Sequence, residues 1–460
     1  MSSRCPSCGG TLRFDIPSQM LVCENCAGSF DPAKFRQSAA ADESTDAQDQ
    51  TKVFTCPSCG AQVASQDLDA VDYCPYCGTF VTLQSRLERL QKPDYIIPFK
   101  ITREKCVELY KARLKSSHFL PKDLLGEGAL SFRSSFIPFW QYSFTPNGSV
   151  TAKGEESWIG GNIRYTQLYD IRGEVSGHVA DGPLHDASAS LEDRITDTIG
   201  GFSRSALVPY NPAYMIGSWA DIADVDKDTY SDQVAEEAVD AIEPQLRDSL
   251  PASSVRSRGN VSLSAVRADG TVTSKLAMLP VWFMTRRDNE RVSYAVVNGE
   301  TGEVFAEVPA DIKKFTCSAL LLAVPLFVLL QLFLNITPKT MLFAVALLSL
   351  IVLVRYTRSY NKGKAAWNRT QDRGYARVFQ KSAAPSTLPS YMKGAFGSIA
   401  SLLLAAACFI YQPVNDLYYY GTAAACILGA VLSIFSSVKL HNLRTSRPVP
   451  HFFDKTKVTL

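Results

Sequence analysis

A double Cys-x-x-Cys pattern occurs twice in the first 80 residues and constrains the fold of this chain more than any other feature. Within each copy 14 residues separate the two cysteine pairs, and the second copy follows the first at a shift of 51 positions. This spacing lets two tight turns bring four thiolates into a tetrahedron around one metal ion. The eight candidate ligands are Cys5, Cys8, Cys23, Cys26, Cys56, Cys59, Cys74 and Cys77.

We expect zinc, one ion per copy, with iron as the alternative, because rubredoxin-like turns use the same Cys-Pro-x-Cys-Gly chemistry. The opening letters MSSRCPSC lack the apolar core of a signal peptide, so we expect reduced thiols in the cytosol rather than disulfides. Each copy is too small to bury a useful core, and the metal should supply most of its folding free energy. We therefore predict zinc ribbons at 1–33 and 53–92, joined by a flexible acidic linker at 34–52.

The charge of the ribbon region bears on nucleic-acid binding. Residues 1–90 contain seven Lys and Arg against eleven Asp and Glu, a net charge of −4, and the whole chain has a formal charge of only +2. Phosphate binding requires the opposite sign. We therefore expect no direct nucleic-acid binding, and a membrane-tethered nucleic-acid-binding protein is the alternative function.

Apolar runs in residues 311–460 predict a helical membrane domain. The run at 315–334 carries no charge over 20 residues, enough to cross about 30 Å of hydrocarbon at about 1.5 Å per residue. Two similar runs occupy 394–411 and 418–438, and a shorter run at 340–356 forms a hairpin with the first. The apolar parts of the four runs contain no ionisable intramembrane residue of the kind that marks a transport path. Four spans that anchor the protein are therefore predicted.

Two of these runs carry small residues at every fourth position, which lets helix backbones approach closely. Simple enrichment of alanine and glycine in membrane helices is an equally good explanation of this pattern. The positions are Gly397, Ser401, Ala405, Gly421, Ala425 and Gly429.

Flanking charge predicts the orientation of the spans. Lys313 and Lys314 precede the first run, nine Lys and Arg against one acid occupy residues 355–393, and five basic residues follow Val438. The two remaining loops have one basic residue between them, Lys339. Because basic loops stay on the cytoplasmic side, we expect a multi-pass protein of the cell membrane with both termini in the cytoplasm.

Residues 93–310 predict an α+β domain around an antiparallel sheet. Alternating apolar residues and turn dipeptides indicate strands in NIRYTQLYDIRGEV and in SKLAMLPVWFMTRR. Helical spacing of apolar residues predicts a helix within residues 102–117, opened by Thr102 as a cap, and a second, charged helix in YSDQVAEEAVDAIEPQLRDSL. The fold class is thus multidomain: two zinc ribbons, an α+β domain and a four-span membrane domain.

Signals for catalysis are sparse. The sequence contains no His-Glu-x-x-His pair, no Walker-type phosphate loop and no dinucleotide fingerprint. One cluster of His and Asp stands in SGHVADGPLHDAS; a second metal site and an acid–base pair are both open there, and an exposed polar loop is the interpretation we prefer. Glu155 and Glu156 are expected on a solvated edge. We expect no enzyme and no small-molecule substrate. The cluster consists of His178, Asp181, His185 and Asp186.

Several motifs follow the ribbons in order: IPFK, IPFW, LPVWF and NGETGEV, and then the apolar runs. This order resembles a family of bacterial double zinc-ribbon membrane proteins, which carry TFIIB-type zinc-ribbon or helicase-like names but lack helicase motifs. The resemblance covers most of residues 5–140 and 278–338, and the long middle insert departs from it. It implies that the protein works beside partners similar to phage-shock protein A or flotillin in the envelope stress response. The expected function is a membrane-anchored cytoplasmic scaffold whose ribbons dock proteins at the inner face of the lipid bilayer.

Overall fold

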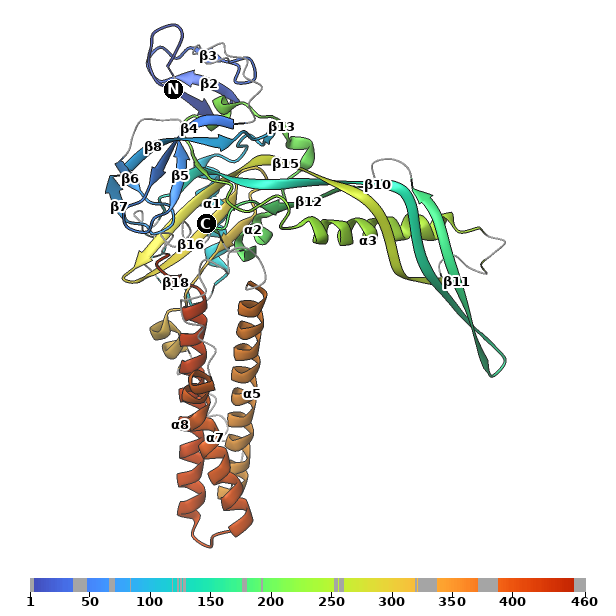
Figure 1. The fold of residues 1–460 in the computed structure, drawn as a ribbon. Helices are drawn as coiled ribbons and strands as arrows, with labels where there is room; N and C mark the ends of the chain where they lie inside the picture. Colours follow the sequence, from blue (N-terminus) through green and yellow to red (C-terminus); the bar gives the residue numbers. More distant parts are fainter. Residues whose placement is uncertain are drawn as a thin grey trace.

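The computed structural model shows a small N-terminal ribbon, a sheet-based body with a long arm, and a bundle of helices (Figure 1). The ribbon lies on the side of the body opposite the helices, and the arm leaves the body sideways and bends toward the side of the helices. The structure describes residues 4–35, 48–65, 71–82, 84–117, 119–121, 124, 126, 130–175, 180–191, 193–251, 255, 260–318, 321, 337–370 and 388–450.

The first ribbon is a three-stranded antiparallel sheet of β1 (Leu12–Asp15), β2 (Met20–Cys23) and β3 (Ser29–Phe30). Alternation along β1 turns Phe14 toward the body, where its ring meets Tyr214 edge-on at a centroid distance of 5.6 Å. The side-chain amide of Gln19 donates to the carbonyl of Phe99 at 2.7 Å. The ribbon is therefore seated on the body through apolar and polar contacts.

The body is built on a sheet of 13 strands. Its two longest strands, β10 (Arg133–Gly160) and β15 (Val261–Asp288), pair antiparallel along most of their length. The strand order is β13-β9-β15-β10-β14-β5-β4-β8. Outside this order, β11 and β12 each pair with β10, and β16 pairs with β15, β17 and β18. Most pairs are antiparallel, as predicted, but the short pairs β10–β14 and β9–β15 are parallel, so the sheet is mixed. The other strands of the body are β9 (Tyr95–Ile96), β12 (Ala180–Asp186), β13 (Val208–Pro209), β14 (Trp219–Asp221), β16 (Arg291–Asn298), β17 (Val304–Ala306) and β18 (Arg447–Pro448).

The second ribbon shares this sheet. Its β5 pairs with β14, where Ala64 stands opposite Ala220, so the sheet runs across the expected boundary between residues 92 and 93. A separate hairpin, β6 (Val71–Tyr73) with β7 (Phe80–Thr82), carries the second cysteine pair. Of the expected linker, residues 36–47 lie outside the described part of the chain, and Gln48 begins β4. The strands that join the sheet are β4 (Gln48–Thr55), β5 (Gln62–Ser65) and β8 (Gln84–Gln91).

The arm consists of β10, β11 (Ile163–Val175) and the first part of β15. The β10–β11 hairpin reverses at Gly161, whose φ of 62° suits glycine. Helix α3 (Ser231–Ser249) lies along the arm (Figure 1) and buries Ile242 and Leu246 with Phe144 of β10. The helix thereby braces the base of the arm.

Helix α1 (Arg103–Lys115) begins where the sequence predicts, because the Thr102 hydroxyl accepts a hydrogen bond from the Lys105 amide at 3.3 Å. Cys106, Tyr110 and Leu114 are buried at four-residue spacing and hold the helix against the sheet. The remaining short helices are α2 (Asp193–Ile199), η3 (Arg204–Ala206) and η4 (Pro212–Met215).

Three described helices are long and apolar enough to cross a membrane. Their spanning segments contain the predicted runs at 340–356, 394–411 and 418–438. The predicted run at 315–334 lies mostly outside the described residues, so the described part of the chain holds three candidate spans where the sequence predicts four. The helices are α5 (Pro338–Thr370), α7 (Leu388–Tyr411) and α8 (Asp416–Arg444), with spanning segments Pro338–Asn361, Gly394–Tyr411 and Asp416–Arg444.

Small residues bring α7 and α8 together. A Cβ on Gly429 would lie 2.6 Å from the carbonyl oxygen of Gly397, and the buried hydroxyls of Ser398 and Ser433 are 2.8 Å apart. A Cβ on Gly421 would meet nothing within 4 Å. The four-residue spacing therefore marks a close backbone contact at Gly397 and Gly429 but not at Gly421.

The end of α8 is fastened to the body. Asn442 exchanges two hydrogen bonds with the backbone of Ala310, at 2.8 and 2.9 Å. Immediately after the helix, β18 pairs with β16, and Arg447 donates to the buried carboxylate of Glu307. Backbone pairing and a buried ion pair thus fix the orientation of α8 relative to the sheet.

Candidate metal centres

Each Cys-x-x-Cys pair closes a tight turn with the same two backbone hydrogen bonds. The Gly9 amide donates to the Cys5 carbonyl at 2.8 Å, and the Cys5 amide donates to the Gly10 carbonyl at 2.7 Å. The turns that begin at Cys23, Cys56 and Cys74 repeat this pattern. The residue after the second cysteine has a positive φ in every turn. These residues are Gly9, Ala27, Gly60 and Gly78.

The turns gather the eight cysteines into two groups of four, in the grouping that the repeat predicts. Within each group the sulfur atoms all lie within 4.8 Å of one another. A tetrahedron with metal–sulfur bonds of about 2.3 Å has sulfur–sulfur edges of about 3.8 Å, so both groups fit a four-coordinate ion. The short edges are Cys5–Cys26 at 3.6 Å, Cys8–Cys23 at 3.5 Å, Cys56–Cys77 at 3.8 Å and Cys59–Cys74 at 3.6 Å.

Polar groups beside the sulfurs favour the thiolate form that a metal requires. The Gly10 amide donates to Cys8 Sγ at 3.4 Å and lowers the pKa of the Cys8 thiol. In the second group the Thr79 hydroxyl oxygen lies 3.3 Å from Cys77 Sγ. Four thiolates that leave no open position are typical of a structural site. The donor set suits zinc and also rubredoxin-type iron.

The two groups differ in exposure. In the first group Cys8 and Cys26 are exposed, whereas Cys5 and Cys23 are buried and belong to a core cluster that includes body residues. In the second group every cysteine is at most 2% exposed. The first centre is therefore half-exposed at the edge of one core cluster, and the second lies wholly within the core of the body.

Strands β15 and β16 cover the second centre. The Phe283 ring packs on Tyr76 at a centroid distance of 6.1 Å, and the Tyr294 hydroxyl donates to the Tyr76 carbonyl at 2.8 Å. Two residues further along β15, Thr285 donates to the carbonyl of Pro75. Sequence reasoning did not assign these residues to the ribbon. The alternation in LPVWFMTRR indicates a strand with one buried face, but it contains no signal for which segment that face covers.

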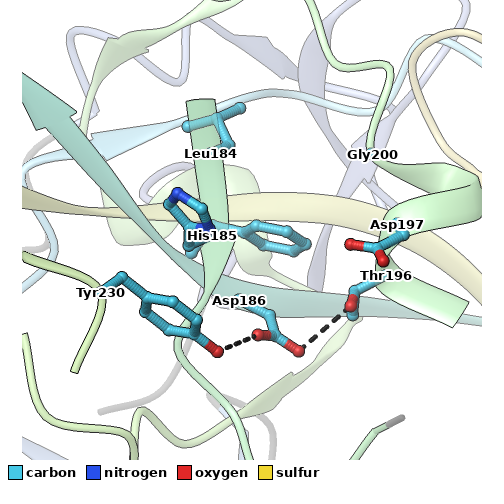
Figure 2. A pocket seen from close by; sticks show the side chains of 8 residues that line it. Leu184, His185, Asp186, Thr196, Asp197, Gly200 and Tyr230 are labelled. Atoms are coloured by element: carbon cyan, nitrogen blue, oxygen red, sulfur yellow. Dashed lines mark hydrogen bonds between the residues drawn. The ribbon is translucent and has the colours of Figure 1, made fainter. Parts of the chain in front are cut away.

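The His and Asp cluster is not the exposed loop that the sequence predicts. His185 and Asp186 end β12 and are 8% and 7% exposed. Asp186 accepts hydrogen bonds from the hydroxyls of Tyr230 at 3.0 Å and Thr196 at 3.1 Å (Figure 2). A cavity of about 180 Å³ lies beside these side chains. The pairing of β12 with β10 buries this segment, because it makes the strand part of the sheet at the place where α3 packs against it.

The contacts of this cluster join separate elements. The His185 ring stacks on Tyr230 at a centroid distance of 4.7 Å, and its Nε2 lies 3.8 Å from the carboxylate of Glu237 in α3. His178 lies outside the described residues, as does the side chain of Asp181. Among the described residues, only the two cysteine groups place enough ligand atoms together for a metal ion. The cluster links β12, α2 and α3, which is a structural role.

The paired acids on the arm have different surroundings. Glu155 is exposed, as the sequence predicts. Glu156 is 2% exposed and accepts a hydrogen bond from the Tyr169 hydroxyl at 2.9 Å. The prediction of a solvated edge is therefore wrong for Glu156, because alternation along β10 places it on the same face as Val150 and Ala152, which pack against α3.

No family model matches the chain, and no curated protein or solved structure is significantly similar to it. The resemblance to bacterial double zinc-ribbon membrane proteins stays a prediction. The geometry of the two cysteine groups and of the apolar helices is therefore the basis for a function.

Proposed function

We propose that the protein is a membrane-anchored scaffold of the cytoplasmic membrane face, in which the first zinc ribbon docks partner proteins and the second holds the body together. The main observation behind this proposal is that the two cysteine groups share the same geometry but differ in burial. Both groups bind zinc in this proposal, with iron as the alternative. A buried metal site stabilises the fold, whereas an exposed, rigid Cys-x-x-Cys turn is accessible to a partner protein.

The arrangement of the parts supports this division of roles. The first ribbon and the helix bundle lie at opposite ends of the molecule (Figure 1). A ribbon in this position stands away from the bilayer, where a soluble partner can reach it. The proposed partners resemble phage-shock protein A or flotillin, and the proposal includes neither catalysis nor nucleic-acid binding.

Charge supports a cytoplasmic location of the body. The body-side ends of the spanning segments carry Arg355 and Arg358 in α5, and Lys439 and Arg444 in α8. The opposite ends, at the turn around residues 412–415, carry no basic residue in α7 or α8. The excess of positive charge on the body side favours the cytoplasm for that side.

A fourth span at 315–334 is part of the proposal. Phe315 packs on Phe119 of the body, at a centroid distance of 5.1 Å. Pro338 begins α5 at the other end of the bundle, where the Lys339 ammonium lies 5.8 Å from the centre of the Tyr419 ring. The chain has to connect one end of the bundle to the other between these points, and residues 319–330 are all apolar.

Reporter fusions test the orientation. A reporter that is active only in the cytoplasm should work when fused after Leu460 and fail when inserted at Val414. A reporter that is active only outside the cytoplasm should show the opposite pattern. Activity of the cytoplasmic reporter at both positions would contradict the spanning arrangement.

Affinity purification in mild detergent tests the docking role. The full chain should recover a coiled-coil or flotillin-like protein. Cys8→Ser should reduce the recovered amount at least tenfold, because the first ribbon loses its metal ion. Ser7→Arg should also reduce recovery while both metal ions remain bound, since Ser7 is exposed and is not a ligand.

The matched control is Lys153→Glu, an exposed change on the arm that leaves the ribbon intact. Recovery that is the same for Ser7→Arg, Cys8→Ser and the unchanged protein would contradict docking through the first ribbon. Recovery of DNA or RNA that declines steeply with salt would instead support the nucleic-acid alternative.

A further inference from the structure

The tip of the arm is apolar and exposed. Ile159, Ile163 and Leu168 are 70%, 59% and 76% exposed, and Tyr165 is 44% exposed. Residues 157–168 contain no acid and a single base, Arg164. Water-facing hairpin tips are usually polar, and a group of large exposed apolar side chains marks a surface that something covers.

The strand register places apolar groups on both faces of the tip. Trp158 stands opposite Tyr165, and their rings stack at a centroid distance of 5.7 Å. Ile159 stands opposite Arg164 on the other face. A docked protein strand or sheet would cover one face or one edge. Apolar residues on both faces suit an environment that surrounds the tip.

The rest of the molecule directs this tip toward the membrane. The arm bends to the side on which the helices leave the body, and its tip ends level with α5 rather than with the body (Figure 1). The bracing of the arm by α3 and the attachment of α8 to the sheet through β18 hold this geometry. The part of α5 nearest the body is the part that meets the headgroup region when the helices cross a bilayer.

We propose that the β10–β11 tip inserts into the headgroup region and upper acyl chains of the body-side leaflet, as a second membrane contact remote from the helices. Stacked Trp and Tyr rings are amphipathic and favour the membrane interface. Arg164 is placed to meet lipid phosphate, with which a guanidinium pairs well. The first carboxylates, Glu155 opposite Leu168 and Glu156 opposite Gln167, lie at the body end of this patch, so the outer part of the tip adds no repulsion from anionic headgroups.

This inference rests on the proposed crossing of the helices, and the full chain in lipid vesicles tests both separately. The probe is tryptophan emission quenched by phospholipids that carry bromine near the upper end of the acyl chain. Trp367→Phe removes the emission of a tryptophan in α5, and the variants below are made in the chain that carries this change. In this background brominated lipid should quench Trp158, and the additional Trp158→Phe change should abolish most of that quenching. Trp219→Phe, a change in the body, is the matched control and should retain the quenching.

A polar tip provides the second measurement. Ile159→Asp with Leu168→Asp, in the Trp367→Phe background, should increase quenching of Trp158 by aqueous iodide at least threefold while the metal content stays unchanged. Equal access of iodide to Trp158 in vesicles and detergent would overturn the proposal. Protection of Trp158 that rises with the protein-to-lipid ratio would also overturn it, because a second copy would then cover the tip. Failure of the protein to float with vesicles would contradict the proposed spans instead.

Discussion

At the residue scale, the four metal-binding turns demand a left-handed backbone conformation after the second cysteine. Glycine supplies it in three turns, and Ala27 adopts it with a φ of 55°. A Cβ in this region approaches the following carbonyl oxygen, so Ala27 carries backbone strain. The glycine pattern of the other turns predicts this requirement from sequence, and Ala27 is the local exception.

Ala27→Gly should stabilise the first ribbon by about 1 kcal/mol, because glycine relieves the strain. The measurement is hydrogen exchange of peptides from residues 5–30 in the full chain, where local opening should slow about fivefold. Gly9→Ala is the reverse change and should accelerate opening by a similar factor, because alanine introduces the same backbone strain. Its Cβ would contact nothing within 4 Å, so the change affects only the backbone. Equal exchange in the two variants would contradict this account.

At the element scale, a given sequence pattern has different meanings at different positions. The four-residue stripe of small residues permits a close helix contact at each of its positions, but α8 meets α7 at Gly429 and leaves Gly421 beside open space. Helix crossing explains this difference, because two helices that cross approach closely over a limited length. The sequence contains the stripe, and the crossing point depends on the packing of both helices.

Gly429→Ala should therefore weaken the α7–α8 contact by about 1–3 kcal/mol, since the new methyl would overlap backbone and hydroxyl oxygens of α7. Gly421→Ala should leave stability unchanged or raise it slightly, because alanine favours helix and no neighbour is crowded. Unfolding in mixed detergent micelles measures both variants. A larger loss for Gly421→Ala than for Gly429→Ala would refute the assigned contact.

At the scale of the whole molecule, the two ribbons of the repeat have unequal roles in the fold. The first has its own three-stranded sheet, and two of its four cysteines join a core cluster of the body. Strands of the second join the sheet of the body, and all four of its cysteines lie in the main core. Loss of metal should therefore disturb the body less at the first centre than at the second. The repeat of 51 residues by itself predicts equal roles.

Cys59→Ser should lower the thermal unfolding midpoint of the body much more than Cys8→Ser. Metal binding in small zinc domains is worth on the order of 10 kcal/mol, and the second centre shares its core with the sheet. Tryptophan emission of the detergent-solubilised chain follows the body, and elemental analysis counts the ions. Two zinc ions per unchanged chain and one in each variant are expected. Equal midpoints, or a red iron-containing protein, would argue against the assignment.

The sequence by itself determined the features that depend on local spacing. The constant spacing of the eight cysteines predicts which four lie together, because each tight turn is formed by residues adjacent in the sequence. Apolar length predicts the segments of α5, α7 and α8 that are able to span a membrane, and Thr102 predicts the start of α1. Each of these follows from chemistry within a few turns of the chain.

Only the tertiary structure decided which parts lie beside one another. The cover of Phe283 and Tyr294 over Tyr76 joins residues more than 200 positions apart, and no local pattern encodes that pairing. The burial of His185 likewise depends on the pairing of β12 with β10 and on the packing of α3 against β12. Long-range packing buried all four cysteines of one ribbon and left two cysteines of the other exposed, because burial is a property of what a segment packs against.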